Sequence, residues 1–197
     1  ACPVRAPENS LSSHKNTETS ACIPVSEKEA LPWTFVTRDQ AQALCARAGK
    51  RLPTSAEWYA LVLGQPGNES LCNSNSPGVA KTGSHESCVA PTQAYDLVGN
   101  VWEWVADDVV NGTYEGRTLP ESGYVHESDT TGVAVLTGDT EQELYGNDYF
   151  WRSNDEGVFG MIRGGFYGSG SDGGVFAVHA DTKSNAASAG IGFRCVK

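Results

Sequence analysis

The chain has 197 residues, a formal net charge of -10 and a hydrophobic content of 39%. This length fits one domain with a sizeable core and is too short for two ordinary domains. The negative charge would repel a phosphate backbone, so we expect no nucleic-acid partner. No apolar run approaches the roughly 20 residues that cross a bilayer, so we expect no transmembrane segment. The 22 glycines are typical of a loop-rich globular protein.

The first 30 residues are polar, contain prolines and show little periodicity. We expect residues 1–30 to form an N-terminal extension and residues 31–197 to form the domain. The only methionine is Met161, so we expect the native start of the chain to lie outside this sequence. Ala1-Cys2 is also compatible with the remnant of a lipoprotein cleavage site, in which case Cys2 would carry a lipid anchor.

Two helices are predicted near the start of the domain. Thr37 and Gln40 have the spacing of a capping box, and apolar residues at helical spacing follow as far as Gly49. A second box, Thr54 to Glu57, begins a helix that ends near Gly64. We expect Trp58, on this second helix, to anchor the core.

The remaining segments have weaker signals. Residues 64–93 are rich in glycine, proline, asparagine and serine, which predicts a loop. Residues 106–160 carry scattered Asp, Glu and Gly, and we expect a long insertion without regular structure. The aromatic residues between Tyr145 and Trp151 allow two interpretations, an exposed contact surface or core packing beneath one.

Six cysteines, an even number, indicate disulfide pairing in an oxidising compartment. They allow 15 connectivities, and spacing alone does not choose among them. No two cysteines have the close spacing of a zinc ribbon. We therefore expect an extracellular protein, or one on a cell or virion surface; the alternative is a cytoplasmic protein with buried free thiols.

The last 35 residues are the most informative part of the chain. Arg163-Gly164-Gly165 and Gly192-Phe193-Arg194-Cys195 bracket a run of small polar residues. Within it, Val175–Val178 and Ile191–Phe193 predict short strands on either side of the most polar stretch, which a disordered tail would not need. Packed walls around a small-residue surface are typical of a binding face on a scaffold.

Four motifs follow one another in a recognisable order. They are Arg51-Leu52-Pro53-Thr54-Ser55-Ala56-Glu57-Trp58, Asp96-Leu97-Val98-Gly99-Asn100-Val101-Trp102-Glu103-Trp104, Arg163-Gly164-Gly165 and Gly192-Phe193-Arg194-Cys195. Together they resemble the formylglycine-generating-enzyme subtype of the C-type lectin fold, from about Cys22 to the last residue. The resemblance implies an α+β fold with short antiparallel sheets, two helices and long loops.

Within that superfamily, the segment Tyr145–Trp151 and the small-residue spacing before the final motif most resemble the variable proteins of diversity-generating retroelements. In that family a reverse transcriptase rewrites adenine-templated codons, and the fold displays the altered side chains to a ligand. The resemblance implies a ligand-binding protein with a variable region at 163–195, whose partner is a protein or a cell-surface ligand. An adhesin of fixed specificity is an alternative on the same fold.

The resemblance also separates fixed from diversified positions. Fixed positions are Arg163, Gly164, Gly165, Gly174, Val175, Phe176, Ala177, Ile191, Gly192, Phe193, Arg194 and Cys195, above a core that holds Trp102 and Trp104. The expected ligand-binding positions are Tyr167, Gly168, Ser169, Asp172, His179, Asp181, Thr182, Ala186, Ser188 and Gly190. We expect their side chains to face mostly solvent.

Disulfides and a metal site also follow from the resemblance. C-type lectin folds join the first helix to the last strand, which implies Cys45 with Cys195; we further expect Cys72 with Cys88 and Cys2 with Cys22. Asp96, Gly99, Val101 and Glu103 match one calcium site of the formylglycine-generating enzymes, with Asp in place of Asn at the first position. The alternative is that Glu103 only hydrogen-bonds within the turn and no calcium is bound.

Enzyme activity is the remaining alternative, as a formylglycine-generating oxidase or a related sulfatase-modifying enzyme. Such oxidases bind copper through two thiols shortly after Arg-Gly-Gly, and no cysteine lies between Gly165 and Arg194 here. The four histidines are scattered without metal-ligand spacing, and no nucleophile elbow is present. We therefore expect no copper site and no enzyme activity.

Overall fold

The computed structural model describes residues 23–65 and 71–197. Two helices, α1 (Arg38–Arg47) and α2 (Ser55–Val62), precede the sheet. The strands are β1 (Trp102–Val110), β2 (Thr113–Tyr114), β3 (Arg117–Thr118), β4 (Gly123–Ser128), β5 (Ala134–Gly138), β6 (Tyr149–Arg152), β7 (Val158–Arg163), β8 (Val178–Thr182) and β9 (Ile191–Phe193). Two 3-10 turns are present: η2 (Glu143–Tyr145) precedes β6, and η3 (Gly170–Asp172) precedes β8.

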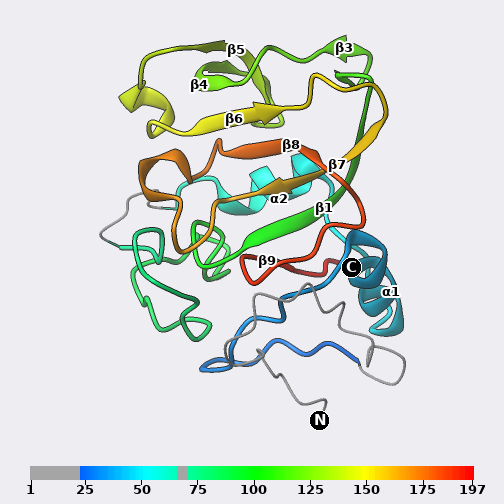
Figure 1. Ribbon diagram of the computed structural model, residues 1–197. Helices are drawn as coiled ribbons and strands as arrows, with labels where there is room; N and C mark the ends of the chain where they lie inside the picture. Colours follow the sequence, from blue (N-terminus) through cyan, green and yellow to red (C-terminus); the bar gives the residue numbers. More distant parts are fainter. Residues whose placement is uncertain (1–22, 66–70) are drawn as a thin grey trace.

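All nine strands form one sheet, in the order β3-β2-β1-β7-β8-β6-β4-β5, with β9 paired to β1. Figure 1 shows them stacked from β9 to β5, with α2 behind the central strands. The expected α+β class with two helices is confirmed. The expectation of several short antiparallel sheets is wrong, since there is a single sheet and two of its pairs, β1 with β9 and β6 with β8, are parallel.

Both helices begin where the sequence predicts. The Thr37 hydroxyl accepts from the Gln40 amide (3.3 Å) and the Gln40 side chain accepts from the Thr37 amide (2.9 Å). Thr54 and Glu57 repeat this reciprocal pair at the start of α2 (3.2 and 2.9 Å). Each capping box satisfies two of the amides that a helix leaves unpaired at its first turn.

The insertion expected at 106–160 is regular structure, and that prediction is wrong. It contains β2 to β6 and parts of β1 and β7. Asn111-Gly112 and Glu115-Gly116, all with positive φ, form two-residue turns that join β1 to β2 and β2 to β3. Asn-Gly is the strongest short hairpin signal in a sequence, so this part of the sheet was detectable.

The strands around the polar run differ in extent from their prediction. Ile191–Phe193 forms β9 as expected. The strand expected at 175–178 begins only at Val178 and continues through Thr182, so His179, Asp181 and Thr182 lie on a strand and not in a loop. Because β8 lies between β7 and β6, its pairing with central strands extends it past the apolar residues.

Two hydrophobic clusters hold the sheet to the helices. One packs α2, through Trp58 and Val62, against residues such as Val105, Phe150 and Met161. Trp58 is fully buried, as expected of a core anchor. The other packs α1 and Leu52 against the Trp104 side of β1, with Ile162 and Ile191.

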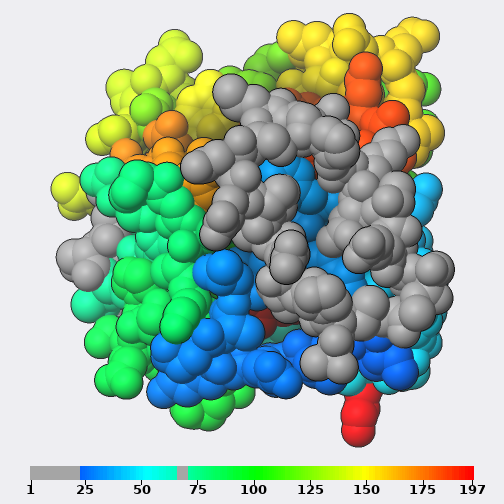
Figure 2. Space-filling view, turned by 60° about the horizontal axis from the view of Figure 1, so that its bottom comes forward, coloured from blue at the N-terminus to red at the C-terminus, as the bar shows by residue number. Residues whose placement is uncertain are grey.

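Disulfides and backbone contacts tie the long segments to this core. Cys45–Cys195 and Cys72–Cys88 are both formed, with Cα atoms 5.5 and 4.9 Å apart, which confirms two expected pairs. The expected Cys2–Cys22 pair and the lipid anchor at Cys2 lie outside the described residues. In Figure 2 the blue segment before α1 lies beside the green segment before β1. There the Glu29 amide donates to the Thr82 carbonyl (2.9 Å).

The helices of the described ranges are too short or too polar to cross a bilayer. This finding concerns residues 23–65 and 71–197 alone. The expected absence of a transmembrane segment in residues 1–22 rests on the sequence.

Trp104→Ala should destabilise the domain by about 3–5 kcal/mol, because it removes a large ring from a packed core. Trp104 is fully buried, and its indole nitrogen donates to the Val36 carbonyl (3.0 Å), which would lose its donor. Trp104→Phe keeps most of the ring volume and should cost less. Urea unfolding of the three proteins measures this difference; equal midpoints for wild type and Trp104→Ala would contradict the core assignment.

Candidate functional site

A buried arginine fixes the start of segment 163–195, the region expected from the sequence to vary. Arg163 ends β7 and has no exposed surface. Its two terminal nitrogens donate to Ser55 Oγ (2.7 Å) and to the carbonyls of Thr131 (2.9 Å), Gly132 (2.9 Å) and Val175 (3.2 Å). Its guanidinium lies 5.0 Å from the centre of the Trp58 ring. Burial lowers the pKa of Arg163 to about 10, so it is charged at neutral pH.

Glycines around Arg163 have no room for a side chain. Gly164 and Gly165 have φ of 93° and 86°. A Cβ on Gly164 would lie 2.3 Å from the Leu97 carbonyl oxygen, and one on Gly174 would lie 2.3 Å from Asp148 Oδ1. These contacts explain physically why three positions expected to be fixed require glycine.

A buried ion pair fixes the other end of the region. Arg194 donates to both carboxylate oxygens of Glu103, through Nη2 to Oε1 and through Nε to Oε2, each at 2.6 Å. Oε2 also accepts from the indole nitrogen of Trp58 (2.8 Å). Glu103 is 4% exposed. The pair ties the segment after β9 to β1 through Glu103, and to α2 through the Trp58 indole. Glu103 also lies opposite Gly192 in the parallel pairing of β1 with β9.

Three of the four residues expected to bind calcium, Asp96, Gly99 and Val101, precede β1, whereas Glu103 lies on β1 itself. The carboxylates of Asp96 and Glu103 are both engaged. Both Glu103 oxygens contact Arg194, and Asp96 Oδ2 accepts from the Gly83 amide (2.8 Å). Burial raises the pKa of Asp96, and the hydrogen bond from Gly83 opposes this shift. As arranged, Asp96, Gly99, Val101 and Glu103 do not fit a calcium ion, since a cation would have to displace Arg194.

In the described part of the chain, no three His, Cys, Asp or Glu side chains converge in a way that would hold a metal. Calcium binding at Asp96, Gly99, Val101 and Glu103 would require Arg194 to leave Glu103, and the chelation experiment below tests it. The alternative, in which Glu103 serves the turn alone, takes a specific form here. Its partners are Arg194 and Trp58, not backbone amides.

A second buried carboxyl shapes the turn before β8. Asp148 is 2% exposed, and its Oδ2 accepts from the Phe176 amide (2.6 Å). Its Oδ1 is buried without a hydrogen-bond partner. Burial raises the pKa of Asp148 to about 8, which the hydrogen bond from Phe176 opposes. Asp148 thus holds the segment Gly174–Ala177 as a mostly protonated acid at neutral pH.

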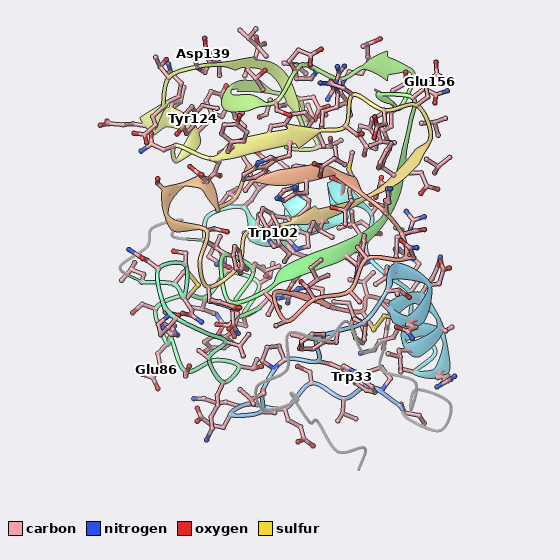
Figure 3. All side chains as sticks on the ribbon, viewed as in Figure 1. Trp33, Glu86, Trp102, Tyr124, Asp139 and Glu156 are labelled. Atoms are coloured by element: carbon pink, nitrogen blue, oxygen red, sulfur yellow. A yellow bond between two sulfur atoms is a disulfide. The ribbon has the colours of Figure 1, made fainter. Side chains whose placement is uncertain are left out.

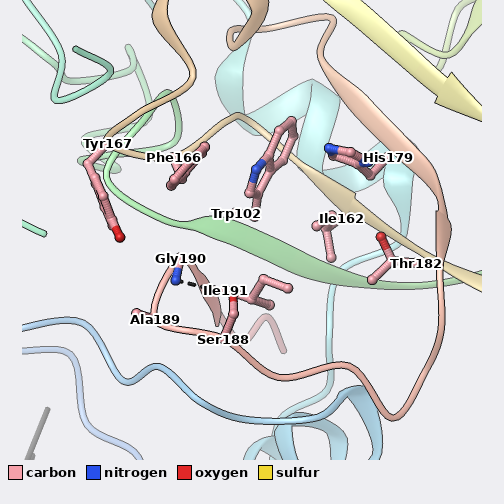
Figure 4. Close-up of a pocket in the computed structure, with 10 residues that line it drawn as sticks. All are labelled: Trp102, Ile162, Phe166, Tyr167, His179, Thr182, Ser188, Ala189, Gly190 and Ile191. Atoms are coloured by element: carbon pink, nitrogen blue, oxygen red, sulfur yellow. Dashed lines mark hydrogen bonds between the residues drawn. The ribbon is translucent and has the colours of Figure 1, made fainter. Parts of the chain in front are cut away.

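A pocket of about 400 Å³ opens between these two anchors, over β1, β7 and β8 and beside the loop before β9 (Figure 4). It is lined by Trp102, Ile162, Phe166, Tyr167, His179, Thr182, Ser188, Ala189, Gly190 and Ile191. Its deepest residues are apolar, with Trp102, Ile162 and Ile191 each less than one tenth exposed. Its polar side-chain groups are three hydroxyls, one imidazole and the Trp102 indole N–H, and none of the lining residues is an acid, a lysine or an arginine.

Five of the ten expected ligand-binding residues line this pocket: Tyr167, His179, Thr182, Ser188 and Gly190. Asp181 lies beside it, with Oδ1 2.9 Å from His179 Nδ1. Gly168, Ser169 and Asp172 lie in the turn around η3, and Ala186 lies in the loop after β8. The sequence signals at 167–190 therefore converge, although half of these residues stand outside the pocket itself.

The expectation of mostly solvent-facing side chains needs correction. Ser188 and Gly168 are exposed, but Tyr167, Asp172, His179 and Asp181 are half-buried. Gly190 is buried, and a Cβ there would lie 2.9 Å from Phe166, so the structure leaves no free room at this position. The Ser169 hydroxyl accepts from the Phe166 amide (2.9 Å), which gives it a structural role in the turn.

Half of the pocket residues were not among those expected. Phe166, Ala189, Ile162 and Ile191 were missed, and Trp102 was expected only in the core. Trp102 is indeed 6% exposed, yet its ring faces the pocket (Figure 4). Phe166 directly follows Arg163-Gly164-Gly165, so its position in the motif was the available signal.

Five rings continue from the pocket across the sheet, and we call them the aromatic ladder: Trp102, His179, Trp151, Tyr149 and Tyr124. His179 stacks on Trp151 with ring centres 4.1 Å apart, and meets Trp102 edge-on at 4.8 Å. Tyr149 lies 4.7 Å from Trp151 and 5.1 Å from Tyr124. Figure 3 labels the two ends, Trp102 in the middle of the sheet and Tyr124 near β4.

The core-packing interpretation of the Tyr145–Trp151 segment is confirmed for Phe150, and the contact-surface interpretation stays a prediction for Tyr149 and Trp151. Phe150 is fully buried in the core beneath the sheet, whereas its neighbours Tyr149 and Trp151 are half-buried on the opposite face. Alternation along β6 produces this division.

Comparisons with known proteins agree with this fold. The family model described as the sulfatase-modifying factor enzyme 1-like domain matches residues 8–197. Two proteins named inactive C-alpha-formylglycine-generating enzyme 2 are similar over 127 residues, at 31% identity in Bos taurus and 29% in Mus musculus. Each match covers 53% of this chain, and 42% and 41% of the respective relative. The chain thus spans less than half the length of these relatives.

Solved structures named as variants of the major tropism determinant share the fold. The P3c variant superposes with a TM-score of 0.52 at 19% identity, over 81% of this chain and 37% of that protein. The M1 variant superposes with a TM-score of 0.51 at 17% identity, over 81% and 36%. At these identities the likeness establishes the architecture.

Arg194→Gln should destabilise the protein by about 3–5 kcal/mol, because Glu103 would be left buried without its cation. Arg51→Gln is the matched control: its pair with Glu57 has the same bidentate form but is 51% and 41% exposed, so its loss should change stability far less than the loss of Arg194. Chelation should leave the wild-type Tm unchanged. A fall in Tm on chelation that Glu103→Gln abolishes would instead establish calcium binding.

Asp148 should make stability fall as pH rises from about 4 to about 8. Its folded pKa of about 8 exceeds its ordinary value, so over this range the folded protein binds a proton that the unfolded chain has lost. Asp148→Asn does not titrate at this position. From pH 5 to pH 8 the wild type should therefore lose stability relative to Asp148→Asn. Urea unfolding at both pH values measures the shift, with exposed Asp155→Asn as control; a parallel pH profile for Asp148→Asn would contradict the assignment.

Proposed function

Because the chain belongs to the family of sulfatase-modifying factor enzyme 1-like domains, we propose that it uses this scaffold to bind a ligand with the surface between Tyr167 and Gly190, without catalysing cysteine oxidation. The ligand is a protein or another molecule on a cell surface. The alternatives are an oxidase of the formylglycine-generating type and an adhesin of fixed specificity.

The observation that carries the proposal is the pocket. It opens within the run predicted from sequence to contact ligand, and its volume of about 400 Å³ is in the range of pockets that bind ligands. Buried anchors stand at both ends, Arg163 and the Glu103–Arg194 pair. The residues that hold the fold are thus separate from the residues that would face a ligand. This separation favours a binding role, because substitutions at surface positions change stability by only about 0.5 kcal/mol.

The likeness to tropism determinants supports a recognition role. Those proteins are named for determining tropism, which depends on the choice of a target. By transfer of this role, we propose that the present chain recognises a protein or surface ligand, and that its 163–195 region is the variable region of a retroelement-encoded protein.

Several observations disfavour the oxidase. The curated relatives that share 31% and 29% identity are named inactive. All four cysteines of the described residues are in disulfides, which leaves no thiol there to bind copper. If a cysteine-containing peptide incubated with the protein and copper were converted to formylglycine, the binding proposal would be wrong.

The proposed location of the protein is based on its disulfides. Two disulfides in a domain of this size are typical of an oxidising compartment. We propose that the protein acts outside the cell or on a cell or virion surface.

Diversification and fixed specificity are distinguished at the level of the gene. A diversified protein requires a second copy of the codons for the variable region that differs from the gene mainly at adenines, together with a reverse transcriptase gene. Sequencing the flanking DNA decides between the two, since a fixed adhesin needs neither.

A library that randomises Tyr167, Asp172, Thr182 and Ser188 should remain mostly folded and should yield binders to a purified test protein such as lysozyme. The physical reason is that these side chains lie between the anchors, and their exchange opens no large cavity in the core. The matched control randomises Trp104, Phe150, Met161 and Val178, all in the core. Protease resistance on a display surface measures folding; if both libraries lost it equally, the division into scaffold and binding surface would be wrong.

A further inference from the structure

The pocket and the aromatic ladder form one continuous surface, because Trp102 and His179 belong to both. From His179 the ladder runs over Trp151 and Tyr149 to Tyr124, on strands β8, β6 and β4. Three of its rings, Tyr124, Tyr149 and Trp151, come from the 106–160 segment, outside the run expected to vary. The surface therefore extends beyond the variable region.

Carboxylates stand along this surface. Asp181 contacts His179 at the pocket, with its side chain 32% exposed. At the other end, Asp172 and Glu141 lie close enough to raise the pKa of Tyr124, with Asp172 the larger cause. Two basic residues lie at the ends of the strands that carry these rings. Lys183 follows β8 and is exposed. Arg152 ends β6 and donates to Leu119, Glu121 and Asn154.

Charge and shape together describe an occupant. A pocket with an apolar interior and no charged lining suits an uncharged apolar side chain, the kind of buried anchor that dominates protein interfaces. Aromatic rings next to carboxylates suit an arginine or lysine, since cations are attracted both to ring faces and to negative charge. The net charge of -10 favours the approach of a basic partner.

We propose that this surface binds a basic protein segment, which inserts one aromatic or long aliphatic side chain into the pocket and lays an arginine or lysine along the ladder between Asp181 and Asp172. This inference rests on the proposed function and adds the chemistry of the partner to it. It also assigns a binding role to Tyr124, Tyr149 and Trp151, which are outside the variable region.

A sugar chain is the competing occupant, and the structure disfavours it. A neutral sugar offers no positive charge to pair with Asp181, which lies beside the pocket in contact with His179. The lining of the pocket also lacks the carboxylate and amide side chains that could pair with several sugar hydroxyls.

The test is selection of a random twelve-residue peptide library, displayed on phage, against the immobilised full chain. We expect enrichment of peptides in which a Trp, Phe, Leu or Met stands within a few residues of an Arg or Lys. A synthetic copy of the best peptide should lose about fivefold in affinity when its arginine is replaced by citrulline, the uncharged isostere. Calorimetry at low ionic strength measures both affinities.

Matched variants locate the contacts. Ser188→Trp fills the pocket from an exposed position and should weaken the peptide at least about tenfold, whereas Asn185→Trp, exposed on the same loop and outside the pocket, should have little effect. Asp172→Asn combined with Asp181→Asn should remove the difference between the arginine and citrulline peptides, which is the coupling expected if the carboxylates contact the cation.

The outcomes separate this inference from the proposed function. Enriched peptides that are acidic or uncharged but still lose affinity in Ser188→Trp would overturn the basic partner and keep the binding site. Binding of a neutral oligosaccharide such as maltohexaose, sensitive to Ser188→Trp, would do the same. Equal binding by Ser188→Trp and Asn185→Trp, or enrichment of no peptide at all, would count against both.

Discussion

The structure depends on one buried cation. Arg163 has no exposed surface, and its charge is solvated by a hydroxyl, three backbone carbonyls and the face of Trp58. No single element holds these acceptors. They come from α2, from the turn between β4 and β5, and from the segment before β8, so the cation is satisfied only when all three are in place. The start of the binding surface is thereby positioned by the whole fold.

A second constraint acts at the far end, where Arg194, with a side chain 23% exposed, pairs with the buried Glu103. Burying two charges is costly unless geometry and hydrogen bonds compensate, and here the bidentate contact and the Trp58 indole provide that compensation. In the related calcium-binding arrangement a metal would neutralise the glutamate. In this chain the Arg194 side chain places its positive charge against Glu103 and helps to hold the segment after β9 against β1.

Between Arg163 and the Glu103–Arg194 pair, the surface contains two kinds of residue with different roles. Glycines such as Gly164 and Gly174 are required by close backbone contacts, and Trp102 both packs against the core and faces the pocket. Ser188 and Thr182 contribute to the lining without such constraints. The proposed binding role is consistent with this division, because the energy that holds the fold and the energy that would bind a ligand then reside mostly in different side chains.

The sequence by itself determined the local features: both capping boxes, the core role of Trp58, and the Cys72–Cys88 and Cys45–Cys195 pairs once the family was considered. These depend on short-range spacing or on motifs with a fixed geometry. The tertiary structure alone decided the rest. It made β4 to β6 from a segment without clear periodicity, placed Arg194 on Glu103 across 91 positions, and connected Tyr124 and Tyr149 through Trp151 to His179 and Trp102. Strand pairing and buried charge depend on neighbours distant in the chain, and no local pattern specifies which neighbours these will be.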